Sequence, residues 1–177
     1  GYQDGAELVL ADVLALASDY GRPVLYSGYA FSDRDQGPPQ DASGRVLDAS
    51  CAGDAGPREA YPDGAWVCQH AWTTVLGMVG WRDAVGQDPV SSRWDDGPVL
   101  ALSRGERGTV VVNAGSTPAS VDVPTPLADG RYCDVAAGPV VDGLCSGDPV
   151  VVVDGTLTVT VPPLAAVALH VGARPAG

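Results

Sequence analysis

The second half of the sequence repeats short apolar segments with a period of two, and this pattern constrains the possible folds more than any other feature. Seven such segments, rich in valine and threonine, are separated by turn residues and lie at 99–102, 109–112, 120–123, 131–135, 150–153, 157–161 and 167–171. Asp154-Gly155 is a strong signal for a two-residue hairpin. Seven or eight short strands at this spacing predict an antiparallel β-sandwich.

Details around these segments complete the prediction for this half. The preceding stretch, 87–98, carries Asp, Pro, Ser and Gly and is interpreted as a linker between two domains. Residues 104–108 predict a tight turn. His170 alternates with Leu169 and Val171, so we expect its side chain to point outward from its strand.

The first half predicts two helices. Asp4, with Glu7 three residues later, is a plausible N-terminal cap for the first helix. This helix is apolar nearly all round, so we expect other parts of the structure to cover it. A second helix is predicted over 67–85, where apolar residues recur at helical spacing, and Gly86 ends it. His70 on this helix is interpreted as a hydrogen-bonded packing residue rather than a catalyst.

Between the two predicted helices lies an apolar run, Val24-Leu25-Tyr26, without polar alternation. Such a run is typical of a buried parallel strand, although the sequence offers no obvious parallel neighbours for it. The following stretch, 32–64, is rich in Gly, Pro and Asp, with 37–39 (Gly-Pro-Pro) as a rigid turn. Loops of this length are usually functional or mobile.

Charge and hydropathy exclude two classes of partner. The chain has 22 acidic and 10 basic residues and a net charge of −12, so it would repel a nucleic-acid backbone. A membrane-spanning helix needs about 20 consecutive apolar residues. The sequence has no such run, so we expect neither nucleic acid nor a membrane as a partner.

The cysteines favour disulfides over a metal site. Cys51, Cys68, Cys133 and Cys145 are even in number and fall into two local pairs, neither with the short spacing of a zinc site. The two histidines, His70 and His170, are far apart in sequence. Two disulfides in an exported protein are therefore the favoured interpretation, and three pairings are possible.

Five groups of residues, taken in order, carry a resemblance to one family of enzymes. They are Tyr20-Gly21-x-Pro23-x-x-x-Ser27-x-Tyr29; Gly37-Pro38-Pro39; Trp66-Val67-Cys68-x-His70-x-Trp72 with Met78-Val79 and Arg82; Ser103-Arg104-Gly105-x-Arg107-Gly108 with Val112-Asn113; and Tyr132-Cys133-Asp134-Val135 with Cys145-x-Gly147. Nearly end to end, the chain resembles the C-terminal third of secreted α-amylases of the animal and actinobacterial type. The last group is the most specific match.

The resemblance implies a fold of the α/β plus all-β class. Residues 1–95 would be the last helix-strand-helix portion of a (β/α)8 TIM barrel, with its eighth strand near 21–31. Residues 96–177 would be an antiparallel Greek-key β-sandwich. The resemblance also implies two disulfides, Cys51 with Cys68 and Cys133 with Cys145.

The resemblance further implies a parent enzyme that hydrolyses internal α-1,4-glucosidic bonds of starch and glycogen with retention. Retention needs a carboxylate nucleophile and a carboxylic acid. The family's catalytic acids come from strands four, five and seven and its calcium ligands also lie upstream, so this chain is expected to carry no catalytic residue, to bind no cofactor and to be inactive alone. Chloride-activated members have an arginine at the position of Val24, which implies an enzyme independent of chloride.

The residues after the predicted strand are the candidate site. Asp33 and Asp35 follow it on the side where barrel chemistry occurs, but we interpret them as capping or solvating the loop. In the family the corresponding loop can touch outer glucose units, so the resemblance implies that Asp33, Arg34 and Asp35 line a substrate rim. The expected partner of the full-length enzyme is an α-glucan, and the expected state is a secreted, extracellular monomer.

The alternative is a free-standing secreted β-sandwich module with a carbohydrate-binding or purely structural role. Sugar-binding modules usually expose aromatic rings that stack on sugar faces. From residue 96 onward only Tyr132 is aromatic, which weakens the carbohydrate-binding version of this alternative.

Overall fold

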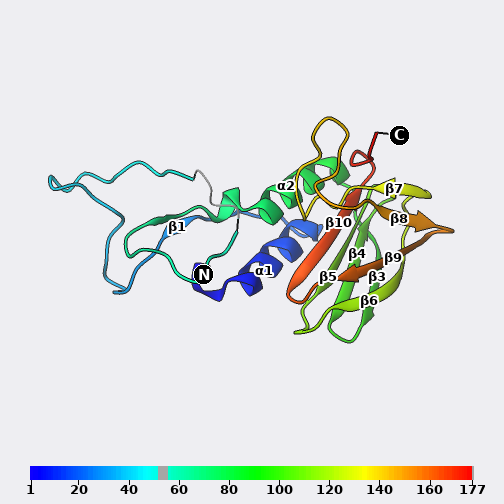
Figure 1. The fold of residues 1–177 in the computed structure, drawn as a ribbon, viewed down its shortest axis with the longest axis horizontal. Helices are drawn as coiled ribbons and strands as arrows, with labels where there is room; N and C mark the ends of the chain where they lie inside the picture. Colours follow the sequence, from blue (N-terminus) through cyan, green and yellow to red (C-terminus); the bar gives the residue numbers. More distant parts are fainter. Residues whose placement is uncertain (52–55, 177) are drawn as a thin grey trace.

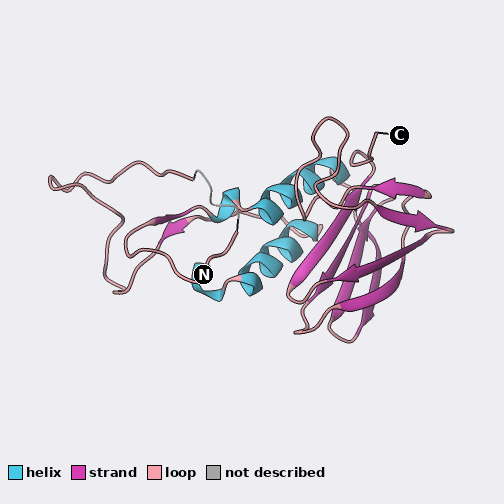
Figure 2. Cartoon of the chain, in the orientation of Figure 1, coloured by secondary structure: helices cyan, strands magenta, loops and turns pink. Residues whose placement is uncertain are grey.

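The computed structural model describes residues 1–51 and 56–176. Two α-helices lie between a loop-rich end and a pair of packed sheets (Figures 1 and 2). The helical elements are η1 (Tyr2–Asp4), α1 (Ala6–Ala17), η2 (Gln69–Ala71) and α2 (Thr73–Val85). The strands are β1 (Gly28–Tyr29), β2 (Trp66–Val67), β3 (Val90–Asp96), β4 (Val99–Arg104), β5 (Gly108–Asn113), β6 (Ala119–Pro124), β7 (Gly130–Tyr132), β8 (Val150–Val153), β9 (Thr156–Val161) and β10 (Ala165–His170).

The antiparallel sandwich predicted for the second half is confirmed. One four-stranded sheet has the order β10-β5-β4-β3 and the other β6-β9-β8-β7, with every pairing antiparallel. The chain changes sheets between β5 and β6 and again between β9 and β10, and the order β6-β9-β8-β7 is that of a Greek key. The inner faces bury a common core of apolar side chains, among them Val111, Leu157 and Leu169.

The hairpin predicted at Asp154-Gly155 joins β8 to β9. Both residues have positive φ, 50° and 69°, as a two-residue turn between twisted strands requires. The Asp129 carboxylate accepts hydrogen bonds from the N–H groups of Asp154 (3.0 Å) and Gly155 (3.1 Å). The turn predicted at 104–108 is also confirmed and joins β4 to β5.

The linker predicted at 87–98 is wrong, because most of it is the edge strand β3. β3 pairs with β4 from Asp96 opposite Val99 back to Val90 opposite Arg104, with one irregularity between Val90 and Ser92. Val90, Ser92 and Trp94 are half-buried and alternate with exposed residues. The strand carries mainly polar residues because it lies at the edge of the sheet, where one side faces solvent.

The helix α1 forms as predicted but begins differently. Its N-cap is Gly5 and no side chain caps it, so the cap assigned to Asp4 is wrong; the Asp4 carboxylate instead contacts the N-terminal amino group. One face buries Val9, Leu10, Val13, Leu16 and Ala17. This burial against α2 and β10 confirms that the helix needs a cover.

The second helix begins at Thr73, six residues later than predicted. Trp66–Val67 pair with Gly28–Tyr29 instead, and His70 lies in the short η2 turn. Strand pairing competes with the helical conformation here, because the backbone groups of 66–67 bond across the ribbon rather than along a helix. Gly86 ends α2 as predicted, with a φ of 62°.

The buried parallel strand predicted at Val24-Leu25-Tyr26 is wrong for this chain. These residues have no secondary structure, and 86% of Val24 and 80% of Tyr26 are exposed. Only the next two residues form a strand, β1, and it pairs antiparallel with β2. A strand needs a hydrogen-bonded neighbour, and the described residues place none beside 24–26. The described residues therefore contain no parallel sheet of the kind expected for a TIM barrel.

The long loop after β1 extends to the end of the molecule opposite the sandwich (Figure 1). It contains a hairpin in which Gln40 bridges Val46 and the Leu47 N–H donates to the Pro39 carbonyl (2.8 Å). The Asp41 carboxylate accepts hydrogen bonds from the Ser43 hydroxyl and the backbone N–H groups of Ser43 and Arg45, which lower the pKa of Asp41. The loop is therefore locally folded.

Candidate functional site

The three residues expected at a substrate rim lie in one exposed turn at the loop-rich end. The Gln36 N–H donates to the Asp33 carbonyl (3.0 Å), and the Asp35 N–H donates to Asp33 Oδ1 (2.9 Å). Asp33, Arg34 and Asp35 are all exposed. The Asp33 carboxylate thus stabilises its own turn, as the interpretation of a capped loop predicts, and the rim role stays a prediction.

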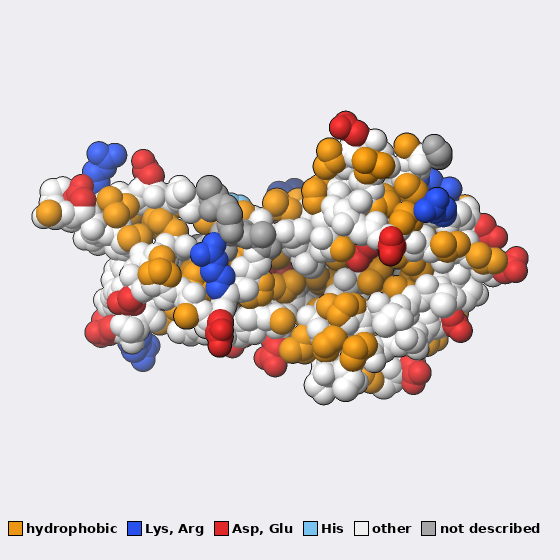
Figure 3. Space-filling model, viewed as in Figure 1, with side chains coloured by type: hydrophobic (Ala, Val, Ile, Leu, Met, Phe, Trp, Pro, Cys, Tyr) orange, Lys and Arg blue, Asp and Glu red, His pale blue; other side chains and the backbone are white. Residues whose placement is uncertain are grey.

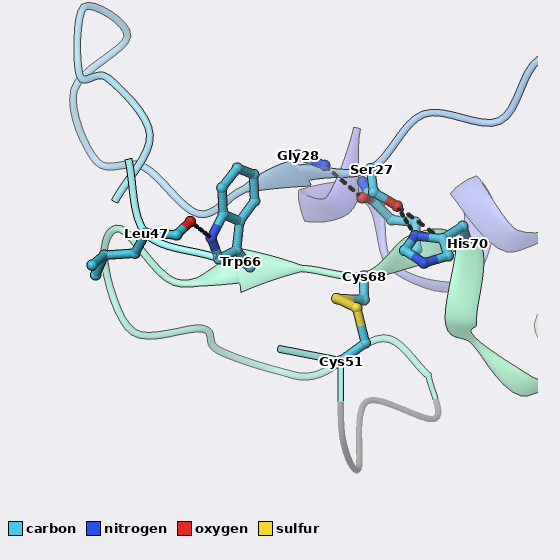
Figure 4. Close-up of a disulfide and its surroundings, with 8 residues drawn as sticks. Ser27, Gly28, Leu47, Cys51, Trp66, Cys68 and His70 are labelled. Carbon is cyan, nitrogen blue, oxygen red and sulfur yellow. Dashed lines mark hydrogen bonds between the residues drawn. A yellow bond between two sulfur atoms is a disulfide. The ribbon is translucent and has the colours of Figure 1, made fainter. Parts of the chain in front are cut away.

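Both disulfides implied by the resemblance are present. Cys51 and Cys68 are joined with a Cα–Cα distance of 5.6 Å, and Cys133 and Cys145 with 5.1 Å. The first disulfide connects the long loop to the segment between β2 and η2 (Figure 4). No group of three or more His, Cys, Asp or Glu side chains among residues 1–51 and 56–176 is arranged to hold a metal ion.

His70 connects η2 to the segment that precedes β1. Its Nδ1 lies 2.7 Å from Ser27 Oγ, and its backbone N–H donates to the same hydroxyl (3.1 Å; Figure 4). The Gly28 N–H donates to Gln69 Oε1 (3.0 Å). The predicted hydrogen bonding of His70 is confirmed, but its side chain is exposed and not packed. No sequence signal pairs Ser27 with His70, since 43 positions separate them.

A buried arginine joins both helices to the sandwich. Arg104, at the end of β4, is 2% exposed. Its guanidinium donates to the carbonyls of Ala17 (3.2 Å), Ser18 (3.0 Å) and Gly86 (3.2 Å) and also to that of Asp88. The first two carbonyls end α1 and the third ends α2, where carbonyls lack helical partners and the helix dipole is negative. From the sequence, Arg104 is assigned only to the turn 104–108 and to one motif of the resemblance. Neither predicts its burial or its contacts with the helix ends.

A second arginine on α2 reaches the same helix end. Arg82 donates to the carbonyls of Leu16 (2.7 Å), Ser18 (2.6 Å) and Gly21 (3.1 Å). Burial, and then the charge of Arg82, lower the pKa of Arg104, whereas Asp19 and Asp88 raise it. We call the contacts of Arg82 and Arg104 with these carbonyls the arginine clamp. The clamp fixes the point at which the chain leaves α1 toward the segment 20–31.

Close backbone contact completes the junction of α2 with the sandwich. Trp81 is fully buried and its Nε1–H donates to the Leu169 carbonyl in β10 (2.8 Å). A Cβ placed on Gly77 would lie 1.8 Å from the Val135 carbonyl oxygen, so only glycine permits this approach. His170 points away from the sandwich core, as expected, but lines a cavity of about 560 Å³ with Gly77 and Leu76. Burial lowers the pKa of His170.

Asp134 is a half-buried carboxylate beside a cavity of about 630 Å³ at the same junction. It accepts hydrogen bonds from the N–H groups of Ala168 (2.8 Å) and Ala136 (2.9 Å). Burial raises the pKa of Asp134, and these hydrogen bonds offset only part of that rise. The carboxylate thus connects β10 to the segment after β7 but is held in a poorly solvated place.

The pKa of Asp134 predicts a pH dependence of stability. Because the native pKa is raised, the folded chain binds the proton more tightly than the unfolded chain. Stability from this group is therefore fully present below the unfolded pKa of about 3.9 and is lost as pH rises through the native value. In Asp134→Asn, the amide oxygen can still accept both backbone hydrogen bonds, but the side chain no longer titrates. The stability of this variant should therefore decrease less between pH 3 and pH 7 than that of the original chain, as thermal unfolding can measure. Parallel curves for the two proteins would contradict the prediction.

Large apolar side chains are exposed near the clamp. Tyr20, Val24 and Tyr26 are the most exposed, and a cavity of about 460 Å³ runs beside them between Leu25 and Val79. Figure 3 shows hydrophobic side chains on the surface of the loop-rich end as well as over the sandwich, with acidic side chains scattered at the rims.

Comparisons with known proteins give a consistent result. Residues 94–172 match the family model of the α-amylase C-terminal all-β domain. The chain is 39% identical to an α-amylase of Thermomonospora curvata over 97% of its length and 27% of that protein. It is 35% identical to an α-amylase-related protein of Drosophila teissieri over 85% of its length and 30% of that protein. The chain therefore spans less than a third of the length of these relatives.

Solved structures agree with the sequence comparisons. α-Amylase I from the earthworm Eisenia fetida superimposes with a TM-score of 0.77 at 29% identity, over 92% of this chain and 35% of that one. A variant of the same enzyme, solved as a complex with maltohexaose, gives a TM-score of 0.76 at 29% identity. The similarity extends beyond the sandwich to most of the chain.

Proposed function

We propose that this chain is the non-catalytic C-terminal part of an α-amylase, because residues 94–172 match the family model of the α-amylase C-terminal all-β domain. The parent would hydrolyse internal α-1,4-glucosidic bonds of starch and glycogen with retention. The proposal rests on similarity over 97% of the chain to an α-amylase and 92% to a solved one. Within such a parent this chain supplies structure, and residues outside it supply the catalytic carboxylates.

In this proposal α1, the segment 20–31 and α2 are the end of a (β/α)8 barrel. The observation that carries it is the exposure of Val24 and Tyr26 in an extended segment between two helices that the arginine clamp fixes to the sandwich. A parallel strand is apolar on both faces because helices and neighbouring strands cover it. Val24 and Tyr26 would become buried when the preceding strands of the parent pair with this segment.

The proposed domain division is 1–95 for the barrel portion and 96–177 for the sandwich. Since β3 pairs with β4, the sandwich sheet itself begins at Val90. The sandwich with its clamp would hold the last barrel strand and its two helices in a fixed position. A free-standing carbohydrate-binding sandwich has less support, because Tyr132 is fully buried and the Arg174 guanidinium lies 4.4 Å from its ring centroid.

The other expectations are kept as parts of the proposal. The chain itself would bind no cofactor; calcium would be held by residues outside it, and chloride would be absent because Val24 is apolar. The parent would be a secreted, extracellular monomer acting on an α-glucan, without nucleic-acid or membrane partners. Two disulfides are consistent with an extracellular location, and no helix in the described residues is long and apolar enough to cross a membrane.

The experiment that tests the proposal is a starch-degradation assay. The isolated chain of 177 residues is expected to release no reducing ends above background, since retaining hydrolysis needs two carboxyl groups about 5 Å apart at a sugar site. A longer polypeptide that carries the preceding part of the parent is expected to be active. Turnover by the isolated chain, or a folded but inactive parent, would contradict the proposal.

A further inference from the structure

The sequence contains two Asp-Pro peptide bonds, Asp88-Pro89 and Asp148-Pro149. A bond of this kind is weak in mild acid, because the aspartyl carboxyl group can close a five-membered ring onto its own carbonyl carbon. The prolyl nitrogen belongs to a tertiary amide and takes up a proton more readily than a secondary amide nitrogen does. Asp88-Pro89 lies in the connection between α2 and β3, whereas Asp148-Pro149 directly precedes β8.

The fold places a charged hydrogen-bond donor on the carbonyl of the first bond. The Asp88 carbonyl oxygen accepts a hydrogen bond from Arg104 Nε–H. Arg104 is 2% exposed, and its other nitrogens are held by three helix-end carbonyls of the arginine clamp. No hydrogen bond between described residues reaches the Asp148 carbonyl. The two Asp-Pro bonds therefore differ in their surroundings although they are identical in chemistry.

Neighbouring contacts hold the Asp88-Pro89 bond from both sides. The Gly105 N–H donates to the Pro89 carbonyl (3.1 Å), and the Val90 N–H donates to Asp19 Oδ2 (2.8 Å). The half-buried Asp88 side chain lies against the backbone of Gly105, where an added Cβ would be 2.4 Å from Asp88 Oδ2. The Asp88 carboxyl group is thus kept beside the turn that carries Arg104.

This arrangement fits acyl transfer from the prolyl nitrogen to the Asp88 carboxyl group. Attack of this carboxyl group on its own carbonyl carbon would place negative charge on the oxygen that Arg104 contacts. A preorganised donor at such an oxygen contributes about 10²–10³ in rate. As the ring closes, the C–N bond breaks and its electron pair stays on the Pro89 nitrogen, which takes the proton of the attacking carboxyl group. Water then opens the cyclic anhydride, so the net reaction is hydrolysis of one peptide bond.

The products of this hydrolysis would also be stabilised by their surroundings. The new α-carboxylate of Asp88 would lie beside the guanidinium group of Arg104. The new amino group of Pro89 would lie one residue from the N–H that binds the Asp19 carboxylate. Each new charge would therefore have a group of opposite sign nearby, and such charge-assisted contacts are stronger than neutral ones.

We propose that the folded chain cleaves itself at the Asp88-Pro89 bond, with Arg104 as the donor that stabilises the oxyanion. The cut would separate residues 1–88, which contain α1 and α2, from the sandwich. Neither disulfide would join the two parts, since Cys51 and Cys68 precede the cut and Cys133 and Cys145 follow it. The arginine clamp would hold the parts together until the chain is denatured. This chemistry is independent of the proposed function.

The test is incubation of the intact chain of 177 residues in mildly acidic buffer, once folded and once in urea. Non-reducing denaturing electrophoresis and mass spectrometry then measure the fragments 1–88 and 89–177, and circular dichroism checks the fold. The bond should break about tenfold faster or more in the folded chain, because urea removes Arg104 from the carbonyl. In the folded chain the Asp148-Pro149 bond is the internal control and should break more slowly by a similar factor.

Three variants separate the two groups that take part. Asp88→Glu would have to close a six-membered ring and should lose the fragments, whereas Asp148→Glu should keep them. Arg104→Lys keeps the charge but not the Nε–H, and in its folded state the rate should decrease to that of the original chain in urea.

Each measurement has an outcome that contradicts self-cleavage. Equal rates at the two Asp-Pro bonds of the folded chain, or cleavage no faster when folded than in urea, would overturn the proposal. Fragments from Asp88→Glu or an undiminished rate in folded Arg104→Lys would overturn the roles of these residues. The comparison with urea decides the matter even when a variant does not fold.

Discussion

Arg104→Ala is expected to lower the free energy of unfolding by about 4 kcal/mol. The guanidinium donates to the carbonyls of Ala17, Ser18, Gly86 and Asp88, and alanine would leave all four without this donor. Hydrogen bonds from a charged donor contribute more than neutral ones, and unsatisfied buried acceptors add a desolvation cost. Urea unfolding monitored by circular dichroism measures the change.

Arg93→Ala is the matched control for this prediction. Arg93 also lies on a strand of the same sheet, but its side chain is 68% exposed and its contact with Asp95 is an open surface pair. Such pairs contribute about 0–1 kcal/mol, so the control should be nearly neutral. Hydrogen exchange should also show that Arg104→Ala loosens the last turn of α1 before the sandwich. Equal stabilities of the two variants would disprove the role of the arginine clamp.

Gly77→Ala is expected to destabilise the chain by about 3 kcal/mol. The new Cβ would lie 1.8 Å from the carbonyl oxygen of Val135 and 2.7 Å from its carbonyl carbon. These are backbone atoms of the segment that follows β7, so relief requires that α2 and this segment move apart. Such a shift would also disturb the neighbouring bond between Thr74 Oγ1 and the Ala136 carbonyl (2.9 Å). Thermal unfolding measures the loss.

Gly80→Ala, one turn further along α2, controls for helix propensity. No atom lies within 4 Å of a Cβ placed there, and Gly80 is exposed. Alanine is favoured over glycine in a helix interior by about 1 kcal/mol, so this variant should be more stable than the original chain. The two substitutions are chemically identical, and opposite signs are expected. A stabilising effect at both positions would show that the close approach of α2 to residue 135 is unimportant.

The two predictions concern the same physical requirement. The sandwich can position the last helices of a barrel only if the contact between them is rigid, and both Arg104 and Gly77 lie in that contact. The helices are individually short and lack side-chain caps, so their stability depends on packing. Loosening the contact should therefore lower the activity of a full-length parent as well as the stability of this chain.

The sequence alone determined the sandwich, because the alternation of valine with polar residues specifies which face of each strand is buried. Positions 154–155 fixed a hairpin because Asp and Gly tolerate positive φ there. The resemblance added the disulfide pairing, which residue spacing left open. The long loop and the end of α2 at Gly86 also followed from local signals, whereas the cap at Asp4 and the first residues of α2 did not.

Only the tertiary structure decided which segments find partners. β3 escaped prediction because an edge strand needs little apolar character, and 24–26 was predicted as a buried strand although nothing in the described chain pairs with it. The ring contact of Tyr29 with Trp66 and the arginine clamp, which joins Arg104 to Ala17, bring together residues that are distant in sequence. Local patterns report how a segment prefers to fold, whereas burial and hydrogen-bond satisfaction depend on neighbours that only the folded chain supplies.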